Sequence, residues 1–240
     1  MAQILCKNEK GIFYLLWGGA QHDIWTDSWH KGHADFINGT YDGHRLLDMR
    51  QFRFDYYKKN LVNLHHVAIA SYVRIVYPYL SDLLGFPYKR SDFDLYKYEG
   101  DGMNCSFLWP KKEMKWTVSI NQETTAEHEG FECLTNIENK YPGDKESAYH
   151  RIFCASHCSS RIINESIPNG ESILISGDSY MIPVAPILAC YYHEVVFLDN
   201  RHEGIGVSNM PYYEDKVFDK VLISCSEKNP PAKYLLWNLQ

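Results

Sequence analysis

Residues 174–183, LISGDSYMIP, place a serine in a tight turn between an apolar run and the possible start of a helix. A hydroxyl at the carboxyl end of a strand and the amino end of a helix lies near backbone N–H groups, which can stabilise a developing oxyanion. Ser179 is therefore a candidate nucleophile, with Gly177 and Asp178 before it. The same residue types are common in turns and helix caps, so the tripeptide alone leaves a purely structural role open.

A serine nucleophile needs a base, and the base needs an orienting partner. The chain has 11 histidines, so position must select among them. The run Asn63-Leu64-His65-His66 comes just before a long segment with helical periodicity. Residues 63 and 65 of an extended segment project toward the same side. This pair is the candidate for the base and its partner.

The elements around these residues indicate a parallel sheet with helical crossovers. Apolar runs predict strands over residues 12–17, 172–176, 194–199 and 220–225. Helix-like spacing predicts helices over residues 66–85 and 180–192. Short strands that alternate with helices in this way form parallel sheets, and we expect the last three strands to be adjacent.

Proline and glycine set the limits of the expected helices. Pro78 should kink or split the first helix, Gly85 is a plausible C-cap, and Pro186 should bend the second helix. Between about 92 and 150 the pattern is irregular, with strand-like pieces such as KWTVSI. We expect a single domain over residues 1–240, with a β-rich excursion at about 92–150 that borders the pocket.

Composition excludes some classes of protein. The 240 residues are 45% hydrophobic and carry 30 acidic against 24 basic side chains, so a nucleic-acid partner is not expected. Seven cysteines form no evident disulfide framework, which favours a reducing compartment. No window approaches the roughly 18 apolar residues of a membrane helix. We expect a cytoplasmic protein, and a periplasmic location stays open if a leader has been removed.

Two stretches resemble blocks of a known family. The stretch YYKKNLVNLHHVAIASY resembles the block Y-Y-x-x-D-x-H-W-x-x-x-G-A-Y of SGNH-like proteins related to alginate O-acetyltransferases. The stretch ILISGDSYMIPVAPILACYYHEVVFLDNR resembles their second block, in which a G-D-S or x-D-S serine precedes a helix, a strand and an acidic-x-Arg ending. The order of the blocks is the same. The resemblance covers residues 56–85 and 172–229 and implies a three-layer α/β/α sandwich with a parallel sheet.

The resemblance also implies roles for particular residues. Ser179 takes the place of the nucleophile, His65 that of the base and Asn63 that of the acid. The backbone N–H of Ser179 and a side-chain donor from the turn at 226–229 would bind the oxyanion. The residues expected to bind substrate are Gly177, Asp178, Arg201, Glu227 and Asn229.

Two departures from the family pattern concern the histidine block. Asn63 replaces an aspartate and His66 replaces a tryptophan. An amide carbonyl can accept from the imidazole but cannot stabilise the imidazolium with a full negative charge. Slower chemistry follows, or a different orienting acid such as Asp178 or Glu227.

The expected function is acyl transfer, of acetyl for example, to or from a carbohydrate hydroxyl in the biosynthesis of a bacterial surface polysaccharide. It needs an acyl donor such as acetyl-CoA and a carbohydrate acceptor, and no permanently bound cofactor. Two alternatives stay open. One is a binding module for polysaccharide on an SGNH-like scaffold that has lost catalysis. The other is a metal enzyme that uses the histidine-rich segment 22–44, with candidate ligands His22, Asp23, Asp27, His30, His33 and Asp35.

Overall fold

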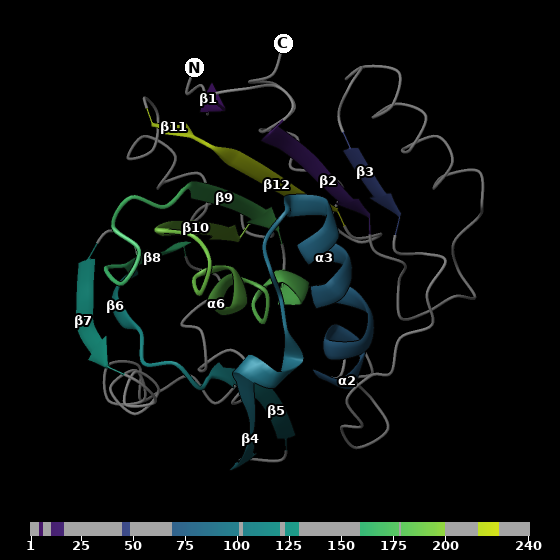
Figure 1. The fold of residues 1–240 in the computed structure, drawn as a ribbon, viewed down its shortest axis with the longest axis vertical. Helices are drawn as coiled ribbons and strands as arrows, with labels where there is room; N and C mark the ends of the chain where they lie inside the picture. The colour runs from purple at the N-terminus through teal and green to yellow at the C-terminus, as the bar shows by residue number, and fades with distance from the viewer. Residues whose placement is uncertain are drawn as a thin grey trace.

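The computed structural model describes residues 5–6, 11–16, 45–48, 69–100, 103–120, 123–129, 159–177, 179–199 and 216–225 (Figure 1). Within these ranges the fold is mixed α/β. The helical segments are α2 (Ile69–Ser71), η3 (Tyr72–Val76), α3 (Tyr77–Leu84), η4 (Arg90–Asp92), η5 (Ser179–Met181) and α6 (Ala185–Leu188). None of these helices is long and apolar enough to cross a bilayer.

Eight strands form the main sheet, in the order β3-β2-β12-β9-β10-β8-β6-β7. They are β2 (Ile12–Leu16), β3 (Arg45–Asp48), β6 (Lys115–Ile120), β7 (Glu123–Glu129), β8 (Ser159–Asn164), β9 (Ser172–Gly177), β10 (Glu194–Asp199) and β12 (Lys220–Cys225). The five strands from β3 to β10 are parallel, and β8, β6 and β7 continue the sheet in antiparallel pairing. Two smaller pairs are β1 (Leu5–Cys6) with β11 (Val217–Phe218), and β4 (Phe93–Gly100) with β5 (Met103–Pro110).

The prediction that the strands at 172–176, 194–199 and 220–225 are adjacent and parallel is confirmed. β9 lies between β12 and β10, with Ile175 opposite Leu222 on one side and Phe197 on the other. The strand expected at 12–17 is also present as β2, which extends the parallel part next to β12.

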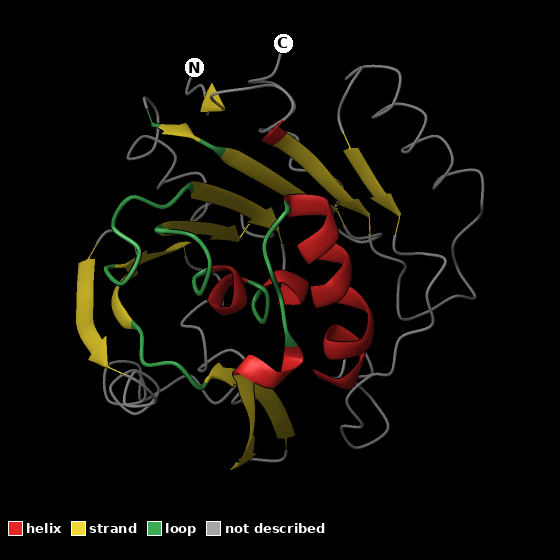
Figure 2. Cartoon of the chain, viewed as in Figure 1, coloured by secondary structure: helices red, strands yellow, loops and turns green. Residues whose placement is uncertain are grey.

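Both faces of the central strands are buried. Ile173 and Ile175 belong to the core cluster shared with α3 and α6, which places these helices against one face of the sheet (Figure 2). Leu174, which points to the opposite face, is also inaccessible to solvent. Burial on both faces is typical of parallel sheets and explains why these strands read as continuous apolar runs.

The helix expected over 66–85 is divided into three parts. The described residues begin with α2, continue as the π-helix η3, and end as α3. The change from η3 to α3 occurs just before Pro78, which has no N–H to donate and sits in the first turn of α3. Gly85 ends α3 as expected, with a left-handed φ of 76° and its N–H bonded to Ser81 O.

The prediction of one helix over residues 180–192 is wrong. The chain forms only the 3₁₀ turn η5 and the short helix α6, separated by turns. Pro186 has no N–H to donate to Ile182 O, and its ring would clash with that carbonyl, so a continuous helix is interrupted at this position. Helical spacing described the burial of this segment correctly, because residues 181–190 are all buried.

Four strands lie in the segment expected to be β-rich, about 92–150. β4 and β5 form a separate antiparallel pair, whereas β6 and β7 belong to the main sheet. The rings of Trp109 and Trp116 meet edge to face, with centroids 5.4 Å apart, and so connect the pair to the sheet. Residues 130–150 lie outside the described ranges.

Candidate active site

The carboxyl ends of the parallel strands meet at one edge of the sheet. Gly177, the last residue of β9, lies opposite Asp199, the last residue of β10. On the other side Ser176 pairs with Ile223, two residues before the end of β12. Ser179 is the first residue of η5, two residues beyond the end of β9. This is the edge at which open α/β sheets bind ligands.

Gly177 is required by close packing. A Cβ at this position would lie 2.6 Å from Met181 Cγ and 2.9 Å from Ser224 Cβ, closer than carbon atoms pack. The chain therefore turns tightly against β12, and the side chain of Met181 packs against Gly177 at the end of β9. The reason for the glycine is this approach, because Gly85 is the only described glycine with a positive φ.

Two tyrosine hydroxyls bond to the backbone just after Ser179. The Tyr72 hydroxyl donates to Tyr180 O at 2.6 Å, and the Tyr77 hydroxyl donates to Pro183 O at 3.0 Å. Both tyrosine side chains are fully buried. They attach the turn that carries Ser179 to η3 and α3.

The π-helix is what places both hydroxyls on one side. In η3 the N–H of Tyr77 donates to Tyr72 O, five residues earlier, so these two residues lie above one another. Their rings are 5.6 Å apart. In a regular α-helix, residues five apart point in different directions. The sequence offers no pattern that would have identified this pair beyond the presence of Pro78 nearby.

The predicted site residues are only partly covered by the structure. Gly177 is the last residue of β9, and the backbone of Ser179 begins η5. The side chain of Ser179 is outside the description, as are the following residues: Asn63, His65, Asp178, Arg201, Glu227 and Asn229. Their roles in base catalysis and substrate binding stay predictions.

No group of three metal-binding side chains occurs within the described ranges. The histidine-rich segment 22–44 lies outside them, so the structure does not bear on the metal-enzyme alternative.

Comparison with known proteins finds similar solved structures, and no match to a family profile or a curated protein. A crystal structure of a DHHW family protein from Eubacterium siraeum is similar with a TM-score of 0.58 and 13% identity, over 97% of this chain and 84% of that one. Two structures of PatB1 from Bacillus cereus are also similar. One carries a sulfonyl adduct and has a TM-score of 0.62 at 15% identity, over 91% of this chain and 82% of that one.

The other PatB1 structure has a TM-score of 0.60 at 16% identity, over 92% of this chain and 84% of that one. At such low identity these neighbours establish a shared α/β fold. The α/β fold of this chain is therefore one that other solved proteins also adopt.

The close packing at Gly177 predicts a coupled effect of two substitutions. Gly177→Ala should lower the free energy of unfolding by about 2 kcal/mol through overpacking. In a Met181→Ala background the same change should cost about 1 kcal/mol less, because the nearest obstructing atom, Met181 Cγ at 2.6 Å, is gone. Chemical denaturation of the four proteins measures this coupling.

Gly85→Ala is the matched control. An added Cβ there meets nothing within 4 Å, and its cost comes from the φ of 76°. It should show no coupling to Met181→Ala. Equal costs of Gly177→Ala with and without Met181 would show that the strand and the turn are not packed as described.

Proposed function

We propose that the protein is a serine-dependent acyltransferase or esterase that transfers an acyl group, such as acetyl, to or from a carbohydrate hydroxyl. The observation that carries the proposal is the position of Ser179, which begins a 3₁₀ turn directly beyond the carboxyl end of β9. In the amino-acid sequence the same turn carries the G-D-S block. The biosynthesis of a bacterial surface polysaccharide is the context that the resemblance suggests.

The likeness to PatB1 supports the fold that this function requires. A sulfonyl adduct, such as the one in the PatB1 structure, is what a reactive nucleophile forms with a sulfonyl reagent. We extend the fold of this chain to a three-layer α/β/α sandwich of SGNH type. Leu174 and Val196 are fully buried although they are on the face opposite α3 and α6, which supports a second covering layer.

The attachment of η3 to the serine turn supports a common site for the two sequence blocks. Tyr72 lies seven residues after His65 and bonds to Tyr180, the neighbour of Ser179. Three residues, His66, Val67 and Ala68, separate His65 from the start of α2 at Ile69, so the histidine block directly precedes this helix in the sequence. The chain thus leads from the predicted base to an element that contacts the predicted nucleophile's turn.

The proposed reaction has two halves. His65 takes the proton of Ser179 as the hydroxyl oxygen attacks the carbonyl carbon of an ester or thioester. The bond from that carbon to the leaving group breaks, and the leaving group receives the proton from His65. A sugar hydroxyl or water then attacks the acyl-serine in the same manner, which releases the product and restores the serine.

Groups at the edge of the sheet would assist both halves. The N–H of Ser179 and a donor from the turn at 226–229 bind the oxyanion, while Asn63 orients His65. Arg201, Glu227, Asn229 and Asp178 line the substrate side of this site in the proposal. The acyl donor, acetyl-CoA for instance, binds transiently.

Removal of the nucleophile is the first test. The full chain should hydrolyse 4-nitrophenyl acetate, and Ser179→Ala should reduce kcat at least about 10³-fold, because the attacking oxygen is lost. Ser91→Ala is the control, since Ser91 is exposed and its hydroxyl donates to the carboxylate of the neighbouring Asp92. Turnover that Ser179→Ala leaves unchanged would refute the nucleophile.

Asn63 and His66 also favour the second candidate, a binding module without catalysis. That candidate predicts that the unaltered chain fails to hydrolyse the ester and yet binds oligosaccharide.

Loss of the Tyr72 hydroxyl tests whether the turn must be fixed for catalysis. Tyr72→Phe and Tyr77→Phe each remove one donor to a backbone carbonyl, so each should cost about 1 to 2 kcal/mol of stability. Tyr72 bonds next to Ser179, whereas Tyr77 bonds four residues beyond it. We expect Tyr72→Phe to lower kcat about tenfold and Tyr77→Phe to lower it less than threefold.

The profile of kcat against pH should keep its shape in both variants, because neither hydroxyl takes part in proton transfer. An equal fall in kcat for the two variants, or an effect confined to KM, would mean that Tyr72 contributes only to stability.

A further inference from the structure

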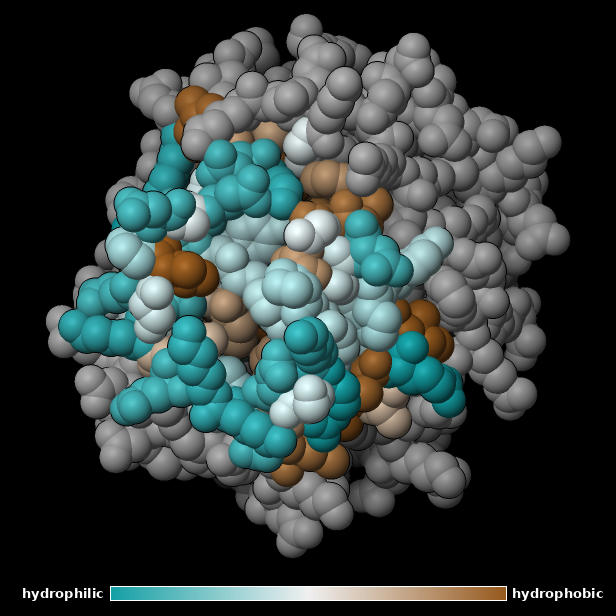
Figure 3. Space-filling view, in the orientation of Figure 1, coloured by the Kyte–Doolittle hydropathy of each residue, from teal (hydrophilic) through white to brown (hydrophobic). Residues whose placement is uncertain are grey.

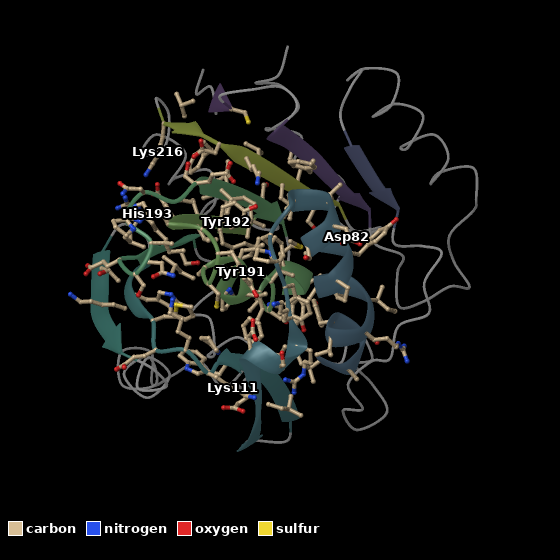
Figure 4. All side chains as sticks on the ribbon, in the orientation of Figure 1. Asp82, Lys111, Tyr191, Tyr192, His193 and Lys216 are labelled. Carbon is tan, nitrogen blue, oxygen red and sulfur yellow. The ribbon has the colours of Figure 1, made fainter. Side chains whose placement is uncertain are left out.

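A hollow of about 390 Å³ lies between the β4–β5 pair and the end of α6. Figure 4 labels Tyr191 beside α6 and Lys111 near the β4–β5 pair below it. The volume is in the range of sites that take small molecules. Figure 3 shows hydrophilic surface over this part of the molecule, with apolar side chains next to it. A ligand for such a hollow has both a polar and an apolar part.

The hollow is at the other end of a crossover from Ser179. The chain leaves the carboxyl end of β9 at Gly177 and must return to the amino end of β10, because the two strands are parallel. Tyr191 comes three residues before β10 begins at Glu194. The hollow is therefore distinct from the candidate active site, and an inference about it goes beyond the proposed acyl transfer.

The floor of the hollow is apolar and is held by aromatic packing. Phe93, Met114 and Tyr191 are among the residues that line it. Tyr191 packs on Phe86, with ring centroids 4.9 Å apart, and Phe93 packs on Tyr88, with ring centroids 5.7 Å apart. Because the floor is already formed, little conformational entropy is lost when a ligand binds.

The charges at the rim balance. The charged side chains that line the hollow are those of Asp92, Lys111 and Lys112. Lys111 pairs with Asp94 at 4.0 Å, so this lysine already has a counter-charge. Among the residues that the structure describes, no ion pair involves Asp92 or Lys112. The rim therefore offers a ligand one carboxylate and one ammonium group, with no net charge.

These two groups belong to chain segments that are bonded together. The N–H of Lys111 donates to Asp92 O at 2.9 Å, so the backbone that leads into Lys112 lies beside Asp92. Burial is the main cause that raises the pKa of Tyr191, followed by the neighbouring Cys190 and by the negative charge of Asp92. The carboxylate of Asp92 therefore lies near the phenol, and the phenol stays neutral. The rim thus presents one pair of opposite charges above the apolar floor.

We propose that this hollow binds a free amino acid with an apolar side chain, in its zwitterionic form. The α-carboxylate lies beside Lys112, the α-ammonium group lies beside Asp92, and the side chain packs on the floor. A ligand with a single charge would leave one of the two rim groups without a partner. An aromatic side chain suits the floor best, because Phe93 and Tyr191 are aromatic.

NMR titration of the full chain with L-phenylalanine tests this site. We expect a dissociation constant on the order of 1 mM. Three analogues each lack one part of the ligand: 2-phenylethylamine has no carboxylate, 3-phenylpropionate has no ammonium group, and glycine has no apolar side chain. Each should bind at least about tenfold more weakly than L-phenylalanine.

Two variants should give reciprocal results with these analogues. Lys112→Gln should weaken the binding of L-phenylalanine about tenfold and should not weaken that of 2-phenylethylamine, which has no carboxylate to lose a partner. Asp92→Asn should weaken the binding of L-phenylalanine about tenfold and should not weaken that of 3-phenylpropionate. The matched controls are Lys115→Gln, whose ammonium group pairs with Glu165, and Asp82→Asn, an exposed carboxylate on α3. Both controls should change binding less than twofold.

Thermal unfolding shows whether each variant is folded, and the analogue series on the unaltered chain tests the site without any substitution. The proposal is overturned if L-phenylalanine does not saturate the protein, if an analogue binds as tightly as L-phenylalanine, or if Lys112→Gln and Lys115→Gln behave alike. Ser179→Ala should bind L-phenylalanine normally, so failure of the proposed catalysis and failure of this site are separate results.

Discussion

Two buried tyrosine hydroxyls satisfy backbone carbonyls in a segment that cannot form a continuous helix. Pro183 and Pro186 remove two backbone donors between β9 and β10, where residues 181–190 are all buried. A buried carbonyl without a donor costs about 1 to 3 kcal/mol. Tyr72 and Tyr77 supply donors to Tyr180 O and Pro183 O. The turn that begins with Ser179 therefore depends on η3 and α3 for its conformation.

The carboxyl end of α3 is also attached to the sheet. The Nζ of Lys220, the first residue of β12, donates to Leu84 O at 2.7 Å, where α3 has no further backbone donor. Lys220 also pairs with Glu171, just before β9. These contacts connect α3 to the amino ends of β9 and β12, while the tyrosines connect it to the turn beyond the carboxyl end of β9. Helix, sheet and serine turn form one packed unit.

The parts of the fold that the sequence predicted are those set by local pattern. Continuous apolar runs identified β9, β10 and β12, since strands buried on both faces need such runs. The segment KWTVSI became β6 with the same limits. The prediction of a helix over 180–192 was wrong because helical spacing in that segment reflects burial, and Pro186 interrupts the helical hydrogen bonds.

Features that depend on contacts between distant residues could not be predicted from the sequence. The π-helix that aligns Tyr72 with Tyr77 depends on packing against a turn about 110 residues away. A hollow of about 390 Å³ between the β4–β5 pair and the end of α6 is lined by residues that no motif brings together, among them Asp92, Lys112 and Tyr191. Of the candidate active site, sequence reasoning identified the turn at Ser179, and the structure places it at the carboxyl edge. The parts assigned to His65 and Asn63 are still predictions.

The position of a covalent adduct shows directly whether Ser179 is an activated nucleophile. The folded chain is treated with phenylmethylsulfonyl fluoride and digested, and the modified peptide is sequenced by mass spectrometry. We expect one adduct per chain, on Ser179, which does not form after the protein has been denatured. An adduct on any other residue of the folded chain, or no adduct at all, would contradict the assignment of Ser179 as an activated nucleophile.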